Sequence, residues 1–216
     1  MDGTVVADKQ SAADAVREVV PGRPLSGEKA QRIVDAMRNS VARRGSAGST
    51  FDHVAREAGV SRGLLHYYFG TKEQLLVEAA RRDCELRLER LEGQLSEAQS
   101  ADDFIDLMAQ SLRETVQDDP DFVTLVFELF TLARRNEDIA LEYAGLMRQT
   151  REHVAGMLAM AEAEGVLRLH AEPQAVAEVL FSLGDGVALR MLSEPDRDFG
   201  PTLAAGIVCA RALLTD

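Results

Sequence analysis

Apolar residues recur along this chain at spacings of three and four positions, which is the period of an amphipathic helix. Ile33, Met37 and Val41 mark one such face and predict a helix from about residue 26 to 44, which Gly45 would end. No alternating run of β-branched residues is long enough for a central strand. The pattern therefore predicts an all-α chain of about nine helices. Beyond residue 98, the expected helices cover about 101–117, 121–135, 137–164, 173–192 and 199–214.

Hydroxyl residues stand where three consecutive helices are expected to begin. Thr50 can cap a short helix, and Ser61 can cap a second one over about 62–69. Gly70 would end that second helix, and the run 71–74 (Thr-Lys-Glu-Gln) is typical of a capping box that opens a longer helix. These signals predict two short helices followed at once by a long one.

The two short helices are joined by a tight turn with the spacing of a helix-turn-helix. Gly59 can adopt the positive φ that such a turn needs, and Val60 supplies an apolar plug between the helices. Leu65 and Phe69 are four residues apart and face inward. A helix of two turns is unstable alone, so its remaining faces are free for a partner. Those faces and the residue just beyond them carry Arg62, His66, Tyr67, Tyr68 and Lys72.

The charge of the chain is divided unevenly along its length. The formal net charge is -12, yet residues 23–75 carry 9 basic and 5 acidic side chains, whereas residues 76–216 carry 13 and 27. No carboxylate occurs from Ala58 to Lys72. Because phosphate contacts are made by basic groups, this segment is suited to nucleic acid although the whole chain is acidic.

The cysteines and the beginning of the chain bear on its compartment. Cys84 and Cys209 form no CxxC or Cys/His spacing, which argues against a disulfide framework and a structural zinc site. The first twenty residues lack a basic start followed by an apolar run, and no eighteen apolar residues are consecutive. We therefore expect a cytoplasmic protein with no membrane partner, no metal and no cofactor.

A helix placed in the major groove presents its first residues to the base edges. Arg62 can make a bidentate contact with guanine, and Gly63 removes a side chain where the helix would approach DNA. Tyr67 and Tyr68 suit phosphate or thymine-methyl contacts, or alternatively cap the core of the small domain itself. Arg43 and Arg44 can contact the backbone of DNA or simply complement the dipole of their own helix end.

The run Thr50–Leu75 resembles the DNA-binding segment of the tetracycline repressor (TetR) family of bacterial regulators, with Gly-Val-Ser in the turn and an aromatic cluster before Thr-Lys-Glu. The resemblance implies that Arg62, Gly63 and His66 approach bases. It also implies phosphate contacts for Thr50, Ser61, Tyr67, Tyr68 and Lys72. Leu64, His66 and Gly70 depart from the commonest pattern, so the operator cannot be inferred from relatives; Leu64 could read a thymine methyl group. The full set of expected DNA-contacting residues is Arg43, Arg44, Thr50, Ser61, Arg62, Gly63, Leu64, His66, Tyr67, Tyr68 and Lys72.

By the same resemblance, the acidic remainder is a helical bundle that encloses a small effector of unknown identity. The candidate pocket residues are Phe104, Met108, Leu112, Phe127, Phe130, Tyr143, Met147, Arg151, His153, Met157, Phe181 and Asp185. Ordinary core packing is the alternative for each aromatic residue and methionine, because any bundle needs such residues. The acidity of the bundle allows a cationic or neutral amphipathic effector.

The last two expected helices are apolar on more than one face, and a second apolar face needs a partner. The resemblance implies a homodimer in which these helices pack against their copies. The candidate interface residues are Val176, Val179, Leu180, Leu183, Val187, Met191, Leu203 and Ile207. Two copies would meet successive major grooves of a near-palindromic double-stranded operator.

These observations predict three parts: a flexible arm over residues 1–25, a helix-turn-helix domain over 26–72, and a ligand-binding and dimerisation domain over 73–216. No catalytic motif or metal-ligand spacing is found, so we expect no enzyme. The leading hypothesis is a DNA-binding transcriptional regulator, more specifically a repressor released by its effector. The alternative is an architectural DNA-binding protein or a helical adaptor without an effector.

Overall fold

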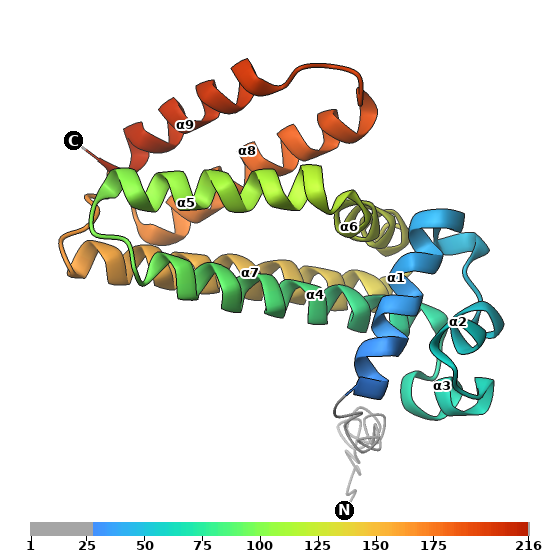
Figure 1. Cartoon of the computed structure of the whole chain (residues 1–216). Coiled ribbons are helices and arrows are strands. Elements are labelled where there is room, and N and C mark those ends of the chain that lie inside the picture. The colour runs from blue at the N-terminus through green and yellow to red at the C-terminus, as the bar shows by residue number, and fades with distance from the viewer. Residues whose placement is uncertain (1–27, 216) are drawn as a thin grey trace, which may run out of the picture.

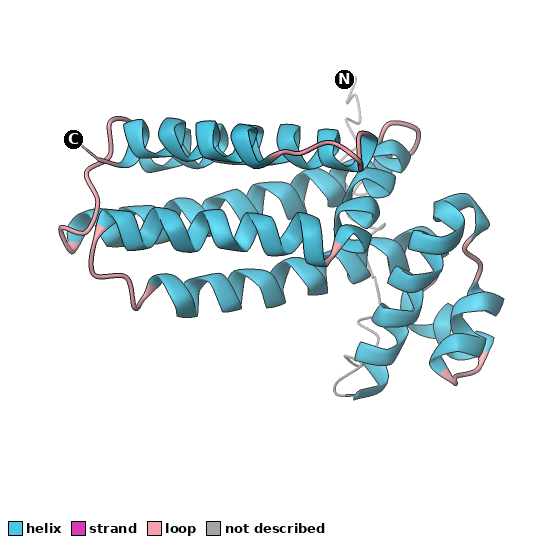
Figure 2. Cartoon of the chain, turned by 45° about the horizontal axis from the view of Figure 1, so that its top comes forward, coloured by secondary structure: helices cyan, strands magenta, loops and turns pink. Residues whose placement is uncertain are grey.

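The structure is a computed structural model that describes residues 28–215, so the expected N-terminal arm lies outside the described residues. Within that range every regular element is a helix, which confirms the all-α prediction (Figures 1 and 2). The helices are α1 (Glu28–Gly48), α2 (Phe51–Ala58), α3 (Arg62–Phe69), α4 (Lys72–Leu95), α5 (Ala101–Arg113), a π-helical segment (Glu114–Asp118), α6 (Pro120–Ala133), α7 (Glu137–Ala163), α8 (Pro173–Ser193) and α9 (Gly200–Leu214).

The helix starts predicted from hydroxyl residues are confirmed. The side-chain oxygens of Thr50, Ser61 and Thr71 accept backbone N–H groups three residues further along, at 3.4, 3.2 and 3.1 Å. The side chain of Gln74 in turn accepts the backbone N–H of Thr71 at 3.3 Å, which completes the capping box. Local sequence therefore determines where α2, α3 and α4 begin.

Two helices differ in shape from the prediction, whereas the bounds of α6, α7, α8 and α9 agree with it to within two residues. Gly45, which was expected to end the first helix, has a φ of 68° and kinks α1 instead, because a further turn follows to Gly48. That turn is held because the carboxylate of Glu128 accepts both the N–H and the hydroxyl of Ser46, at 3.2 and 2.5 Å. The helix expected over 101–117 changes to π-helical geometry after Arg113. The π-helical segment ends at Asp118, because Pro120 disfavours the α conformation at Asp119.

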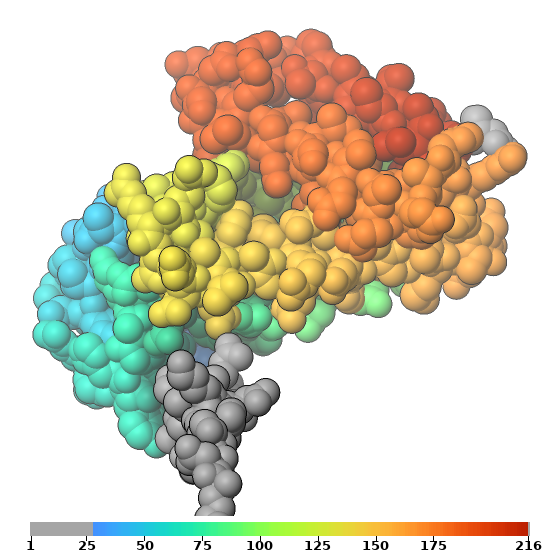
Figure 3. Space-filling model, turned by 180° about the vertical axis from the view of Figure 1, so that it is seen from behind, coloured from blue at the N-terminus to red at the C-terminus, as the bar shows by residue number. Residues whose placement is uncertain are grey.

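Helices α1, α2 and α3 form a head at one end of the molecule, and α8 and α9 form the outermost layer of the bundle at the other (Figures 1 and 3). Helix α4 packs against α3 near its start and continues along α7 through the bundle (Figure 1). One hydrophobic core joins the head to the near half of the bundle and includes Ile33, Leu65, Leu75 and Leu129. A movement within the near half of the bundle can therefore reach the head through packed side chains.

Candidate DNA-binding surface and bundle cavity

The turn between α2 and α3 fixes the position of the expected recognition helix. Gly59 is left-handed, with φ 67° and ψ 38°, and its N–H bonds the carbonyl of Ala55. The N–H of Val60 bonds the same carbonyl at 2.9 Å. Leu65 is fully buried, so α3 is held on the head by its inner face while its outer face stays open to solvent.

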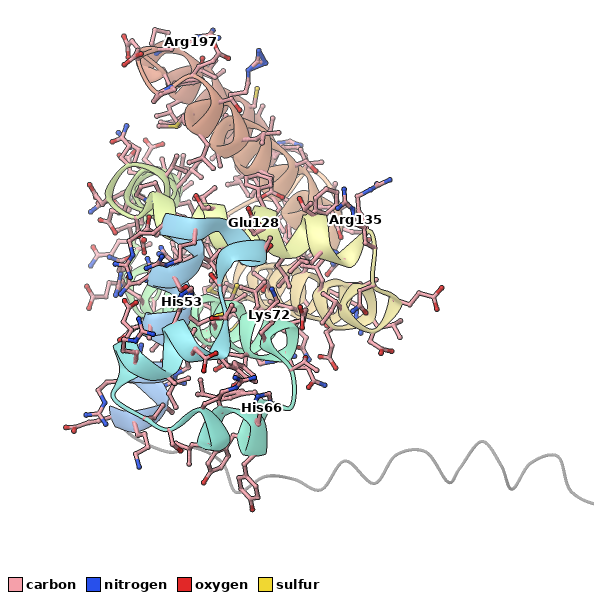
Figure 4. All side chains as sticks on the ribbon, turned by 90° about the vertical axis from the view of Figure 1, so that its right-hand side faces the viewer. His53, His66, Lys72, Glu128, Arg135 and Arg197 are labelled. Atoms are coloured by element: carbon pink, nitrogen blue, oxygen red, sulfur yellow. The ribbon has the colours of Figure 1, made fainter. Side chains whose placement is uncertain are left out.

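The outer face of α3 carries most of the residues expected to approach bases. Arg62, Gly63 and His66 are exposed, and the ring of Tyr67 is 71% exposed. A Cβ atom placed on Gly63 would meet nothing within 4 Å, so the backbone there is open to a partner. His66 lies at the end of the molecule opposite Arg197 of the α8–α9 loop (Figure 4). This face is a ridge that a DNA groove can accommodate.

Arg62 and His66 hold each other in place. The Nε atom of Arg62 donates to Nε2 of His66 at 3.3 Å, and Nδ1 of His66 lies 3.3 Å from the carbonyl oxygen of Gly70. These contacts fit a neutral ring with its proton on Nδ1, an assignment made from the contacts. The ring also packs edge-on against Phe51, with centroids 4.6 Å apart. The two predicted base readers therefore form one unit.

Sequence reasoning missed the carboxylate that faces this unit. Asp52, in the first turn of α2, pairs with Arg62 at 3.2 Å, with both side chains more than half exposed. The absence of acidic residues between Ala58 and Lys72 gave no sign of it, because Asp52 comes from the preceding helix. An exposed pair of this kind is worth about 0–1 kcal/mol, so DNA can displace it.

The remaining expected contacts vary in availability. Thr50 and Ser61 use a side-chain oxygen lone pair as a cap, which leaves each hydroxyl proton free to donate to a phosphate. Lys72 is half-buried and donates to the carbonyl of Ser46 at 3.0 Å (Figure 4). Leu64 packs half-buried against the head core rather than projecting outward, so the structure does not favour the thymine-methyl role.

The other cationic and aromatic candidates lie around this ridge. Arg43 forms an ion pair with Glu57 at 2.6 Å, while Arg44 is exposed. Tyr68 is half-buried, and its ring meets that of Tyr67 edge-on with centroids 5.0 Å apart. Arg43 must therefore leave Glu57 to contact a phosphate, whereas Tyr67 needs no rearrangement.

The bundle contains a mainly apolar cavity of about 330 Å³ between α4, α5, α6, α7, α8 and α9. Seven of the twelve expected pocket residues line it: Met108, Leu112, Phe127, Tyr143, Met147, Phe181 and Asp185. The other five lie elsewhere: Phe104, Phe130, Arg151, His153 and Met157. The periodicity of a helix shows which residues face inward, but it does not separate cavity walls from solid core.

Each of the five misplaced residues has a physical reason for its position. Phe104 and Met157 are buried in the second core, at the far end of the bundle. Phe130 is 44% exposed and lies beside Tyr143, with ring centroids 6.0 Å apart. The two ionisable residues instead contact carboxylates outside the cavity. Arg151 binds Glu178 at 2.8 Å, and His153 meets Glu92 at 3.1 Å near the surface.

Two ionisable side chains of the cavity wall have opposite charges and different surroundings. Arg87, which sequence reasoning missed, pairs with Asp119, donates to Thr115 at 3.1 Å and lies 4.1 Å from the ring centroid of Phe122. Burial lowers the pKa of Arg87, and nearby Asp83 opposes that change. Only its place on the buried side of α4, three residues after Cys84, could have signalled it.

Asp185 carries the negative charge of the cavity wall. Burial raises the pKa of Asp185, and Arg151 partly offsets that rise. Burial also raises the pKa of Tyr143, and the negative charge of Asp185 raises it further. Asp185 and Tyr143 both line the cavity, so one ligand within it can contact both side chains.

An ion-pair network connects the cavity with the head. Asp119, in the turn before α6, accepts from Arg87 of the cavity wall and from Arg38 of α1. Arg38 also meets the buried carboxylate of Asp83 at 3.4 Å. Burial raises the pKa of Asp83 even though Arg38 and Arg87 both lower it. The carboxylate of Asp119 thus connects the wall of the bundle cavity with the first helix of the head.

The expected dimer residues divide between the inside and the outside of the chain. Val176 is buried in the second core, so a partner cannot reach it. Five more of the expected dimer residues line the bundle cavity: Leu180, Leu183, Val187, Leu203 and Ile207. Met191 packs against a small apolar cluster that contains Val116, Val123 and Ala188. Val179 and Leu183 are substantially exposed, as are Leu189 and Val208, which the sequence analysis did not select. The outer face of α8 and α9 therefore does expose apolar side chains, but only some of them belong to the set expected from the sequence.

The chain matches two families over most of its length. Residues 33–79 match "Bacterial regulatory proteins, tetR family". Residues 101–213, more than half of the chain, match "BetI-type transcriptional repressor, C-terminal". The chain belongs to the TetR family. It is accordingly a transcriptional regulator with a helix-turn-helix DNA-binding domain, as the resemblance of the 50–75 run predicted.

Individual relatives agree with this assignment. The regulator BetI of Rhizobium meliloti is 28% identical over 73% of this chain and 75% of its own, and the regulator PksA of Bacillus subtilis is 25% identical over 79% and 82%. BetI of Agrobacterium fabrum is 49% identical over 49 residues, a match that covers 23% of this chain and 24% of that protein.

Solved TetR-like structures share the fold. A regulator from Saccharomonospora viridis in complex with choline has a TM-score of 0.66 and 21% identity, over 87% of this chain and 98% of its own. FadR of Bacillus subtilis in complex with stearoyl-CoA has a TM-score of 0.69 and 17% identity, over 83% and 98%. At these identities the likeness establishes the fold alone.

Two further searches concern the described residues only. Among residues 28–215, no helix has the length and apolar character needed to cross a membrane. In the same part of the chain, no group of three or more His, Cys, Asp or Glu side chains is arranged to hold a metal ion.

Proposed function

We propose that this TetR-family regulator is a repressor that binds a near-palindromic operator as a homodimer and leaves it when a small molecule fills the bundle cavity. The observation that carries the proposal is that α4 belongs to both sites. Its first turn packs against α3, and further along it contributes Arg87, Leu88 and Leu91 to the cavity wall. A ligand that moves α4 can therefore change the position of the recognition helix.

For operator recognition, we assign base contacts to Arg62 and His66 and close approach of the backbone to Gly63. A guanine edge would replace Asp52 as the partner of the Arg62 guanidinium. Ser61, Thr50 and Tyr67 would position the head through phosphate contacts, which carry no sequence information directly.

For dimer formation, the outer face of α8 and α9 supports packing against a second copy. Val179, Leu183, Leu189 and Val208 leave large apolar side chains in solvent, and a symmetric partner would cover them. Two heads in one dimer would then read two half-sites about 34–36 Å apart, or somewhat more.

For release, the effector must bind two forms of the dimer with different affinities. The network Arg87–Asp119–Arg38 supports a route from the cavity wall to α1, and the shared α4 supports a second route to α3. The structural neighbours that hold choline and stearoyl-CoA carry ligands of unlike chemistry, so the likeness does not choose an effector class.

Selection of bound duplexes from a random library tests this function. The wild-type chain should enrich an inverted repeat, and Arg62→Ala should lose about 1–3 kcal/mol of preference at particular base pairs. Tyr67→Phe should instead weaken binding to all duplexes alike, because it removes a phosphate contact. Arg148→Ala, which removes an exposed cation from α7, serves as the charge-matched control and should bind as the wild type does.

Three outcomes would contradict parts of this proposal. Unchanged affinity and preference in Arg62→Ala would refute the role of that residue. Enrichment of single half-sites by a monomer would refute the dimer. Operator binding that no cavity ligand alters would favour the effector-independent architectural protein.

A further inference from the structure

The charges that face the cavity differ in whether the protein already neutralises them. The guanidinium of Arg87 is fully engaged by Asp119, Thr115 and the ring of Phe122. Asp185, in contrast, makes no hydrogen bond or ion pair with any residue in the described part of the chain. An incoming anion would have to displace Asp119. An incoming cation would instead meet a carboxylate whose neighbouring cation, Arg151, is already paired with Glu178.

The third charged residue of the wall, Arg113, lies at the edge of the cavity. Its side chain is exposed, and its Nε atom donates to the carbonyl of Ala109 on its own helix at 3.3 Å. It is shared with an adjacent depression that Met191 and Phe199 line. Asp185 is exposed as well, so exposure does not separate these two residues. Arg113 differs because its Nε atom already has a partner and because it lies where the cavity meets the adjacent depression.

The surroundings of Asp185 suit an organic cation better than a hydrated metal ion. Tyr143 and Phe181 line the same cavity, and aromatic rings attract a weakly hydrated ammonium group. The rest of the wall is mainly apolar, with Leu88, Met108 and Phe127 among its members. The cavity thus has one polar anionic position beside a large apolar volume.

We propose that the effector is an amphipathic organic cation whose ammonium head pairs with Asp185 beside Tyr143 and whose apolar part fills the remaining cavity. This inference rests on the proposed function only in naming that ligand an effector, since binding can be measured without DNA. A small ammonium head alone leaves most of the apolar wall of the 330 Å³ cavity uncovered. Each added methylene should therefore tighten binding about fourfold until the cavity is full.

Calorimetry on the full wild-type chain tests the charge preference without any variant. The probes are butyl-, hexyl- and octyltrimethylammonium, with octanoate and 1-octanol as anionic and neutral compounds of matched length. Affinity should rise from butyl to octyl, and octyltrimethylammonium should bind roughly tenfold or more tightly than octanoate or octanol. Tighter binding of octanoate, equal binding of all three octyl compounds, or binding of none would overturn the proposal.

A pair of isosteric variants tests the residue. Asp185→Asn should weaken octyltrimethylammonium about tenfold or more and leave octanol unchanged. Asp196→Asn removes the same charge from the α8–α9 loop, outside the cavity, and should bind all probes as the wild type does. Equal losses in both variants would mean that only the overall charge attracts the cation, and would refute the role of Asp185. Duplex binding by the ligand-free wild type is scored separately, so failure of the operator proposal is distinguishable from failure of this one.

Discussion

Replacing Asp119 by asparagine should cost the protein far more stability than its place in a turn suggests. The carboxylate of Asp119 accepts from Arg38 of α1 and Arg87 of α4, so it joins the head to the bundle. Asparagine keeps the shape of the side chain but removes the charge and turns one acceptor into a donor. Two guanidinium groups then share a partly buried site with no anion other than Asp83 between them.

The exposed fractions set the size of the effect. Breaking a fully buried ion pair costs about 3–5 kcal/mol. The side chains of Arg38, Asp119 and Arg87 are 21%, 25% and 23% exposed, so solvent screens part of the loss. Asp83 continues to neutralise Arg38, which lowers the cost further. We therefore expect about 2–3 kcal/mol, or a fall in Tm of about 4–12 °C for a chain of this length.

Thermal unfolding followed by circular dichroism, at one protein concentration, measures the change. Glu142→Gln is the control, because it breaks the Arg81–Glu142 pair, which joins α4 to α7 at 3.0 Å with Glu142 half exposed. That variant should lose less than about 1 kcal/mol. If Asp119→Asn unfolds at the same temperature as Glu142→Gln, the network is not a structural connection between head and cavity, and the reasoning is refuted.

Two other predictions concern the glycines of the head and the pH dependence of the cavity. Gly59→Ala should destabilise the fold by about 1–2 kcal/mol because of its φ of 67°, although the space is free; Gly63→Ala should stabilise α3 slightly yet weaken duplex binding. Urea unfolding and duplex titration check both variants. A more stable Gly59→Ala or a less stable Gly63→Ala would contradict these assignments. Burial raises the pKa of Asp185, the charge of Arg151 partly offsets that rise, and the charge of Asp185 in turn acts on Tyr143. The folded chain therefore holds the carboxyl proton of Asp185 more tightly than the unfolded chain does. The group therefore adds stability as pH falls and loses it as pH rises through its folded pKa, while affinity for octyltrimethylammonium falls as pH falls through the same range. Titration calorimetry at a series of acidic pH values should show this fall in octyltrimethylammonium affinity for the wild type. The affinity of Asp185→Asn should not change with pH over the same range.

Local signals in the sequence were sufficient to predict the helix starts and the turn of the head. The caps Thr50, Ser61 and Thr71 and the turn glycine Gly59 act through hydrogen bonds and φ values within a few residues, so short-range pattern locates them. The expectation that Arg62 and His66 lie on one exposed face followed from the period of the helix. The long-range partner Asp52 did not, because a contact between helices depends on how they cross.

The bundle was predicted less completely for the same reason. Helical periodicity placed Tyr143, Phe181 and Asp185 inward, but it placed Phe104 inward equally, and only packing separates a cavity wall from a filled core. Arg87 was overlooked because a buried arginine is expected only where a partner is known. That partner, Asp119, is 32 residues away in the chain.

The central claim is that an acidic protein binds DNA through a basic head. The salt dependence of duplex binding tests this claim most directly. Affinity for a duplex selected by the wild-type chain is measured by fluorescence anisotropy between about 50 and 200 mM salt. We predict a linear fall of log affinity with log salt concentration, which amounts to roughly a thousandfold loss if about six phosphates are neutralised. Affinity that does not change with salt would contradict it.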